Sequence, residues 1–134
     1  MRAIFTCVIF IFSSLAQAQD LVAWLKSNNP HNYFPSNAEY QILKPACNKK
    51  TCFKLISVYY VTDSLHGINR LAIFNNEGIY LGVFSGFPEA PINTDGAILL
   101  FPKSKYGSSI SFQGKSPPSN AYIDGHNYEF EKAL

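Results

Sequence analysis

The chain has 134 residues and a nearly balanced charge, with eleven Lys and Arg against nine Asp and Glu. This length fits one domain, because domains typically hold about 100–150 residues. The small net charge argues against a general binder of polyanions, so nucleic acid is not an expected partner. Only 15% of the residues are charged and as many are aromatic, which favours a packed core over disorder.

The first eighteen residues have the three parts of a secretory signal peptide. Arg2 gives a positive start, an apolar run covers residues 3–12, and residues 16–18 form a small-residue end. This order predicts cleavage after Ala18, and the apolar run is shorter than the about 20 residues of a membrane-spanning helix. We therefore expect a mature domain of residues 19–134 with no further membrane span. It is expected in the periplasm, with secretion beyond it left open.

Apolar residues spaced for one helix face predict a short N-terminal helix, with Asp20 as its cap. The helix is expected to end near Asn28-Asn29-Pro30. The stretch that follows is rich in turn residues and offers Tyr33 and Phe34 as core anchors.

From residue 40 onward the pattern changes to strands. β-branched and aromatic residues predict strands over residues 40–44, 54–62, 70–74, 79–84, 97–101 and 108–112, and a last edge strand over 127–131. A short loop ending in Gly78 predicts the clearest hairpin, whereas residues 115–120 are expected to be loop. The sequence predicts an α+β domain, with an antiparallel sheet of about five to six strands and a short N-terminal helix.

Two cysteines remain once Cys7 leaves with the signal peptide. Cys47 and Cys52 form a close pair, which in an exported protein favours a disulfide. So short a loop should stabilise the fold by only about 2 kcal/mol. A metal site is the competing interpretation, but no His, Asp or Glu lies within five residues of either sulfur to complete a tetrahedral set.

The sequence carries no catalytic fingerprint. It lacks the nucleophile-elbow, zinc-protease, phosphate-loop and dinucleotide motifs. The run from Asp63 to His66 has the residue types of a hydrolase triad, but three triad members cannot align within one turn, and Asp63 is expected to cap that turn. His31, His66 and His126 are scattered beside turn residues, which is typical of exposed loop histidines. We expect neither an enzyme nor a bound cofactor or metal, and a small hydrolase with an unrecognised site remains an alternative.

The segment Tyr40-Gln41-Ile42-Leu43, followed by Ala46-Cys47 and Cys52, resembles the periplasmic inhibitor of vertebrate lysozyme family. That family also has a disulfide-closed loop after a Tyr-Gln-apolar-apolar strand. The likeness continues weakly into residues 92–101, where the family has a comparable Asp-Gly turn before an apolar strand. It covers about half of the mature chain, with gaps.

The resemblance implies that the loop between the cysteines enters the active-site cleft of a lysozyme, where a histidine of the family meets the catalytic carboxylates. Lys50 stands at that position here, and an ammonium group can also pair with two close carboxylates. The expected partner is therefore a cell-wall-lytic enzyme, bound through residues 48–51 of the loop. The residues assigned to partner binding are Asn48, Lys49, Lys50 and Thr51.

Two other interpretations of the loop stay open. The protein is alternatively a periplasmic immunity protein against a secreted lytic toxin, which needs the same export and the same stiff interface. The cysteines can also simply hold a hairpin whose lysines, Lys49 and Lys50 with Lys44 and Lys54, keep a sheet edge soluble. A homodimer is left open as well.

Overall fold

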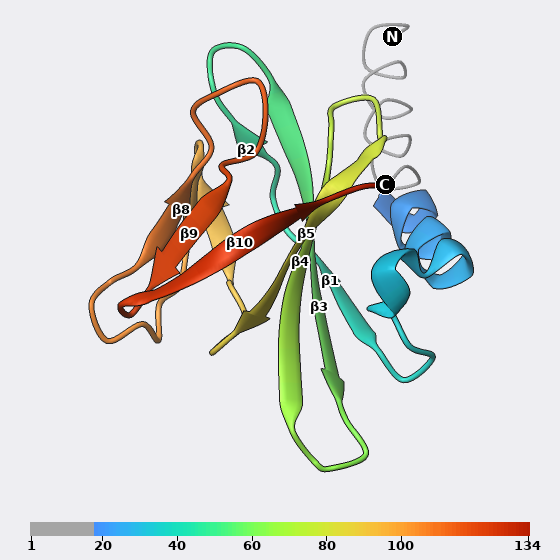
Figure 1. The fold of residues 1–134 in the computed structure, drawn as a ribbon. Helices are drawn as coiled ribbons and strands as arrows, with labels where there is room; N and C mark the ends of the chain where they lie inside the picture. Colours follow the sequence, from blue (N-terminus) through green and yellow to red (C-terminus); the bar gives the residue numbers. More distant parts are fainter. Residues whose placement is uncertain (1–17) are drawn as a thin grey trace, which may run out of the picture.

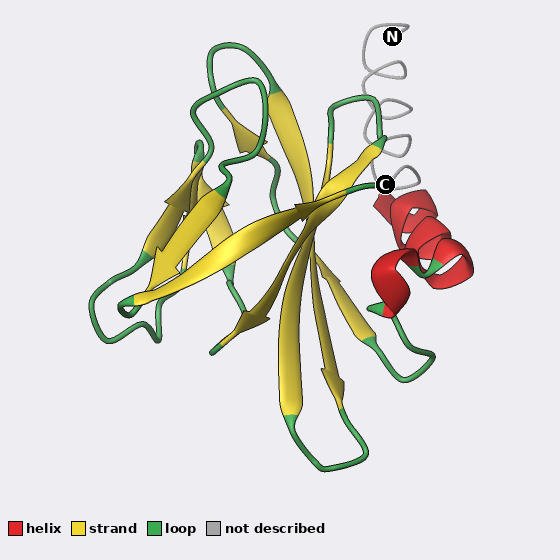
Figure 2. Ribbon diagram, viewed as in Figure 1, coloured by secondary structure: helices red, strands yellow, loops and turns green. Residues whose placement is uncertain are grey.

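The structure is a computed structural model, and it describes residues 18–134. The predicted signal peptide lies outside the described residues, apart from Ala18. The described chain has a helix over residues 18–28, a short 3₁₀ turn η1 (Pro30–Asn32), and strands in two antiparallel sheets (Figure 2), which confirms the predicted α+β class. The strands are β1 (Glu39–Ile42), β2 (Ala46–Cys47), β3 (Cys52–Val61), β4 (Gly67–Phe74), β5 (Tyr80–Phe87), β6 (Asn93–Asp95), β7 (Ile98–Leu100), β8 (Ser109–Ser111), β9 (Asn120–Ile123) and β10 (His126–Lys132).

The larger sheet has seven strands in the order β1-β3-β4-β5-β10-β9, with β2 also paired to β3. The smaller sheet has the order β6-β7-β8. The helix and the smaller sheet lie on opposite sides of β3, β4 and β5, and the larger sheet curls until β9 lies beside β8 (Figure 1). The domain is thus built in layers, with the central strands in the middle.

The central strands are buried on both faces, which explains why their sequences are apolar without alternation. On one face, Leu55, Leu71 and Phe84 pack toward the smaller sheet. On the other face, the core under the helix contains Leu25, Ile56, Ala72, Phe74, Tyr80 and Val83. Successive residues along each strand therefore enter different cores.

Several predicted elements need correction. The sheets hold more strands than the five to six expected, because strands of two to four residues carry too little pattern to predict. Residues 127–131 were expected at an edge, but β10 lies between β5 and β9 in the larger sheet. Asp20 lies inside the helix and is not its cap, and Phe34 is buried whereas Tyr33 is only partly covered.

The contact between β5 and β10 depends on Gly82. This glycine has φ +147° and faces the backbone of Glu131, at a spacing that leaves no room for a β-carbon. Close approach of two backbones is a common reason for glycine inside a strand. The pairing places the Glu131 side chain beside the segment that follows the helix.

Candidate functional site

The cysteine-bridged turn, residues 48–51, is formed as the sequence predicts. Cys47 and Cys52 are cross-strand partners of β2 and β3 with their α-carbons 4.1 Å apart, and a disulfide joins them. The backbone amide of Cys47 also donates to the carbonyl of Gly96, 3.1 Å away, in the turn between β6 and β7. The base of the turn is thus fixed to both sheets.

Asn48 holds the turn from inside. Its Nδ2 group donates to the carbonyl oxygens of Phe112 and Gly114, each at 2.8 Å. Its Oδ1 atom accepts from the backbone amides of Lys50 at 2.7 Å and Thr51 at 3.0 Å. All four hydrogen-bonding positions of this amide, two donors and two acceptor lone pairs, are therefore used within the chain.

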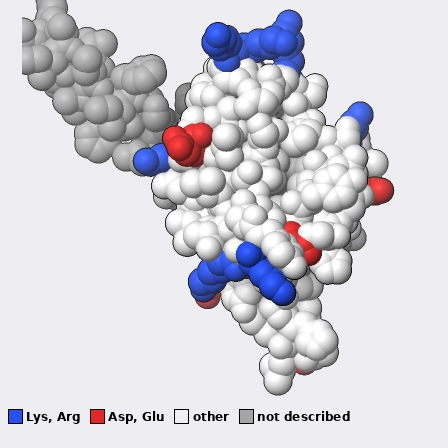
Figure 3. Space-filling view, turned by 90° about the vertical axis from the view of Figure 1, so that its left-hand side faces the viewer, with Lys and Arg blue, Asp and Glu red and all other residues white. Residues whose placement is uncertain are grey.

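Lys49 and Lys50 are the exposed members of the turn, whereas Asn48 and Thr51 are half-buried. Lys115 is exposed as well, and it directly follows Gly114, which is bonded to Asn48. Figure 3 shows basic side chains gathered at the end of the molecule where the bridged turn lies. Of the four residues predicted to bind a partner, Lys49 and Lys50 are therefore the two that are exposed.

The turn between β3 and β4 has no catalytic geometry. Asp63 and His66 are both exposed. The cap that was expected from Asp63 comes instead from Thr62, whose Oγ1 accepts from the amide of His66 at 3.1 Å. His126 is exposed too, although it is the first residue of β10, so the predicted exposure is right for two of the three histidines and the loop position is wrong for His126.

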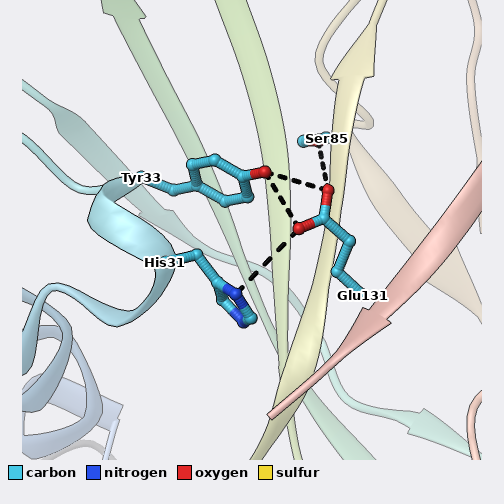
Figure 4. Close-up of polar contacts among 4 residues, drawn as sticks. All are labelled: His31, Tyr33, Ser85 and Glu131. Atoms are coloured by element: carbon cyan, nitrogen blue, oxygen red, sulfur yellow. Dashed lines mark hydrogen bonds and ion pairs between the residues drawn. The ribbon is translucent and has the colours of Figure 1, made fainter. Parts of the chain in front are cut away.

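His31 is the exception, because it belongs to a polar cluster that the sequence did not predict (Figure 4). Its side chain is only 13% exposed, and its Nδ1 lies 4.0 Å from Oε2 of Glu131. The hydroxyl of Tyr33 lies 2.9 and 3.0 Å from the two oxygens of the same carboxylate, and Ser85 Oγ donates to it at 3.5 Å. Three residues from the η1 segment and β5 thus converge on one carboxylate of β10.

A cation lies on the other side of Tyr33. The guanidinium carbon of Arg70 is 3.6 Å from the centroid of the Tyr33 ring, and Arg70 is 8% exposed. Its NH2 nitrogen donates to the hydroxyl of Tyr60 at 2.8 Å. The hydrogen bond to Glu131, followed by burial, raises the pKa of Tyr33, so its hydroxyl stays protonated as a donor.

The cluster fastens the segment after the helix to the sheet, and it does not form a nucleophile with its base. Ser85 and His31 both face the carboxylate of Glu131, and no hydrogen bond joins Ser85 to His31 within residues 18–134. A serine nucleophile needs that bond, because the imidazole must take its proton. The geometry therefore lacks the contact on which such chemistry depends.

Residues 18–134 contain no group of three or more His, Cys, Asp or Glu side chains placed to hold a metal ion. Within the same range, no helix has the length and apolar character needed to cross a bilayer. Comparison with family models, with curated proteins and with solved structures gives no match for this chain. The likeness to the lysozyme-inhibitor family thus stays a prediction from the sequence.

Proposed function

We propose that this protein is an exported binding protein that inhibits a peptidoglycan-cleaving glycoside hydrolase by inserting the bridged turn into its active-site cleft. The single observation that carries the proposal is the exposure of Lys49 and Lys50 on a backbone held at its base by the disulfide and from inside by Asn48. The periplasm, where the signal peptide would send the chain, is where such enzymes reach the cell wall.

The chemistry of the turn suits a glycosidase cleft. Such clefts contain two carboxyl groups, about 5 to 9.5 Å apart, that perform the hydrolysis. An ammonium group pairs with carboxylates through short, charge-assisted hydrogen bonds. Because the turn is already ordered, docking it costs little conformational entropy, which is how a rigid loop gains affinity.

Charge points to the class of target. The exposed cations Lys49, Lys50 and Lys115 would slow the encounter with a strongly basic lysozyme and speed the encounter with an acidic enzyme. Lys50 also replaces the histidine expected from the resemblance. We therefore propose an acidic lytic enzyme as the target.

The test is inhibition by the purified mature chain, residues 19–134, against lysozymes of several classes and of different net charge. Lys49→Ala/Lys50→Ala should weaken inhibition about a hundredfold, taking about 1.4 kcal/mol for each lost charge pair. The matched control is Lys103→Ala/Lys105→Ala, which removes two exposed lysines from another loop and should change nothing. Lack of inhibition and of binding across the whole panel would remove the proposal.

An immunity protein against a secreted lytic toxin would use the same exposed turn and differ only in its target. Gene context separates the two, because an immunity gene normally lies beside the gene of its toxin. A pull-down with the immobilised mature chain, repeated with the Lys49→Ala/Lys50→Ala variant, identifies the partner and tests the turn together.

A further inference from the structure

A concave surface lies where the helix and η1 meet the start of β5 and the end of the chain. A cavity of about 460 Å³ is lined by Trp24, Pro30, His31, Ile79, Tyr80 and Leu134. This volume falls within the range of about 300–1,000 Å³ that is usual for small-molecule sites. Trp24 is 39% exposed and packs against Tyr80, with 5.2 Å between the ring centroids, so one aromatic ring is both held in place and open to solvent.

Two polar atoms in the lining side chains lack partners. Nε2 of His31 and the hydroxyl of Tyr80 are buried and make no hydrogen bond. Tyr80 is only 8% exposed. A buried polar group without a partner costs about 1–3 kcal/mol, so native proteins rarely keep one without a reason. Two such atoms, both in residues that line one cavity, indicate a ligand that supplies the missing bonds once the atoms are uncovered.

The states of the two groups define what that ligand must offer. Burial raises the pKa of Tyr80, so its hydroxyl is a neutral donor. Nε2 of an imidazole either accepts or donates a hydrogen bond, so His31 needs a partner that can do both. A hydroxyl group meets both needs, because it accepts one hydrogen bond and donates another.

We propose that this cavity binds a neutral saccharide. A sugar ring carries hydroxyls along its edge, which suit His31 and Tyr80. It also has a face of C–H bonds, whose positive hydrogens pack on the negative face of an aromatic ring such as Trp24. Glu131 faces His31 from outside the lining of the cavity, and its negative charge disfavours an anionic ligand. This site is independent of the proposed function of the bridged turn.

The backbone beside the cavity is the part expected to move on binding. Asn29, His31 and Asn32 have φ of 43°, 60° and 60°, in the left-handed region that residues other than glycine rarely adopt. Each such residue costs about 1 kcal/mol or more and persists only because its surroundings fix it. Since both unpaired atoms are closed to solvent, a shift of this turn would open them to the hydroxyls of the sugar.

The fluorescence of Trp24 tests the proposal directly, because the chain has one tryptophan and it lines the cavity. The mature chain is titrated with chitotriose, maltotriose and galactotriose, and binding is measured in parallel by calorimetry. At least one sugar should change the emission and bind. Tyr80→Phe should lower the affinity for that sugar about tenfold, which is the loss expected for one hydrogen bond of a buried neutral group. The control Tyr122→Phe, at a tyrosine that is 68% exposed on β9, should bind as the unmodified chain does.

Unfolding measurements separate loss of binding from loss of structure. Tyr80→Phe removes only an unpartnered hydroxyl, so its stability without sugar should equal or exceed that of the unmodified chain. No response to any of the three sugars, or equal affinity in Tyr80→Phe, would overturn the proposal. Binding of the apolar probe indole with no binding of sugar would overturn it too.

Discussion

Replacement of Asn48 by alanine should destabilise the domain more than loss of the disulfide that spans the same turn. The side chain makes four hydrogen bonds, to the carbonyls of Phe112 and Gly114 and from the amides of Lys50 and Thr51. Three of the four are partly buried. At about 1 kcal/mol for each partly buried bond, the loss is about 3 kcal/mol. Closing so short a loop with a disulfide contributes only about 2 kcal/mol.

Thermal unfolding of the mature chain, followed by circular dichroism, measures the difference. For a domain of this size 1 kcal/mol corresponds to about 4 °C, so Asn48→Ala should lower Tm by about 12 °C. Cys47→Ser/Cys52→Ser should lower it by about 8 °C. Gln113→Ala is the matched control, because this neighbouring amide makes one exposed side-chain hydrogen bond and its loss should shift Tm by less than about 2 °C.

An Asn48→Ala variant that unfolds at the same temperature as Gln113→Ala would refute this prediction, because the four bonds would then contribute nothing to folding. If the turn is the inhibitory element, Asn48→Ala should also bind its target more weakly at a temperature where it is fully folded. That loss would come from the entropy of a turn that is free to move before docking. Slower association of Asn48→Ala with the immobilised target, at equal folded fraction, is the expected observation.

Three further predictions concern the rest of the fold. Gly82→Ala should destabilise the domain by about 3 kcal/mol or more, because its β-carbon would collide with the carbonyl of Glu131, and hydrogen exchange should report the loss between β5 and β10. The hydroxyl of Ser104, with other donors, lowers the pKa of Asp124. The ionised carboxylate therefore stabilises the fold above its unfolded pKa of about 4, and this stabilisation is lost as pH falls through the lower folded pKa. The difference in stability between Asp124→Asn and the unmodified chain should accordingly narrow from pH 5 to pH 2. Burial raises the pKa of Tyr80, so the neutral tyrosine contributes fully to the stability of the fold below pH 10, and this stability is lost at higher pH. Alkaline unfolding should therefore begin above pH 10 and need a higher pH in Tyr80→Phe.

Local pattern was enough to predict the central strands. Residues 55–58 and 71–74 are buried without interruption, and such runs are typical of strands covered on both faces. The position of β10 was not predictable, because whether a strand lies at an edge depends on which partners it meets. β9 has four residues and follows Pro117 and Pro118, so its segment was predicted as loop up to Asn120.

The bridged turn and the cluster around Glu131 also differ in how far the sequence could predict them. The bridged turn is contiguous in sequence, and the spacing of Cys47 and Cys52 in a chain with a predicted signal peptide is enough to predict it. The cluster around Glu131 joins Tyr33 to a carboxylate 98 residues further along the chain, and His31 faces the same carboxylate. The turn-rich segment before Tyr33 is the only local sequence feature of this cluster. That segment does not predict a contact with a carboxylate near the end of the chain.

The apolar cluster that includes Phe53 and Phe112 supports the bridged turn, whereas the cluster that includes Tyr80 lies under the cavity lined by Trp24. The two clusters share no residue. The middle layer of strands thus partitions the domain into two compartments that can be altered separately. Substitutions at residues of the two clusters that lie more than about 10 Å apart should add without coupling. One surface can then be altered while the opposite one keeps its shape.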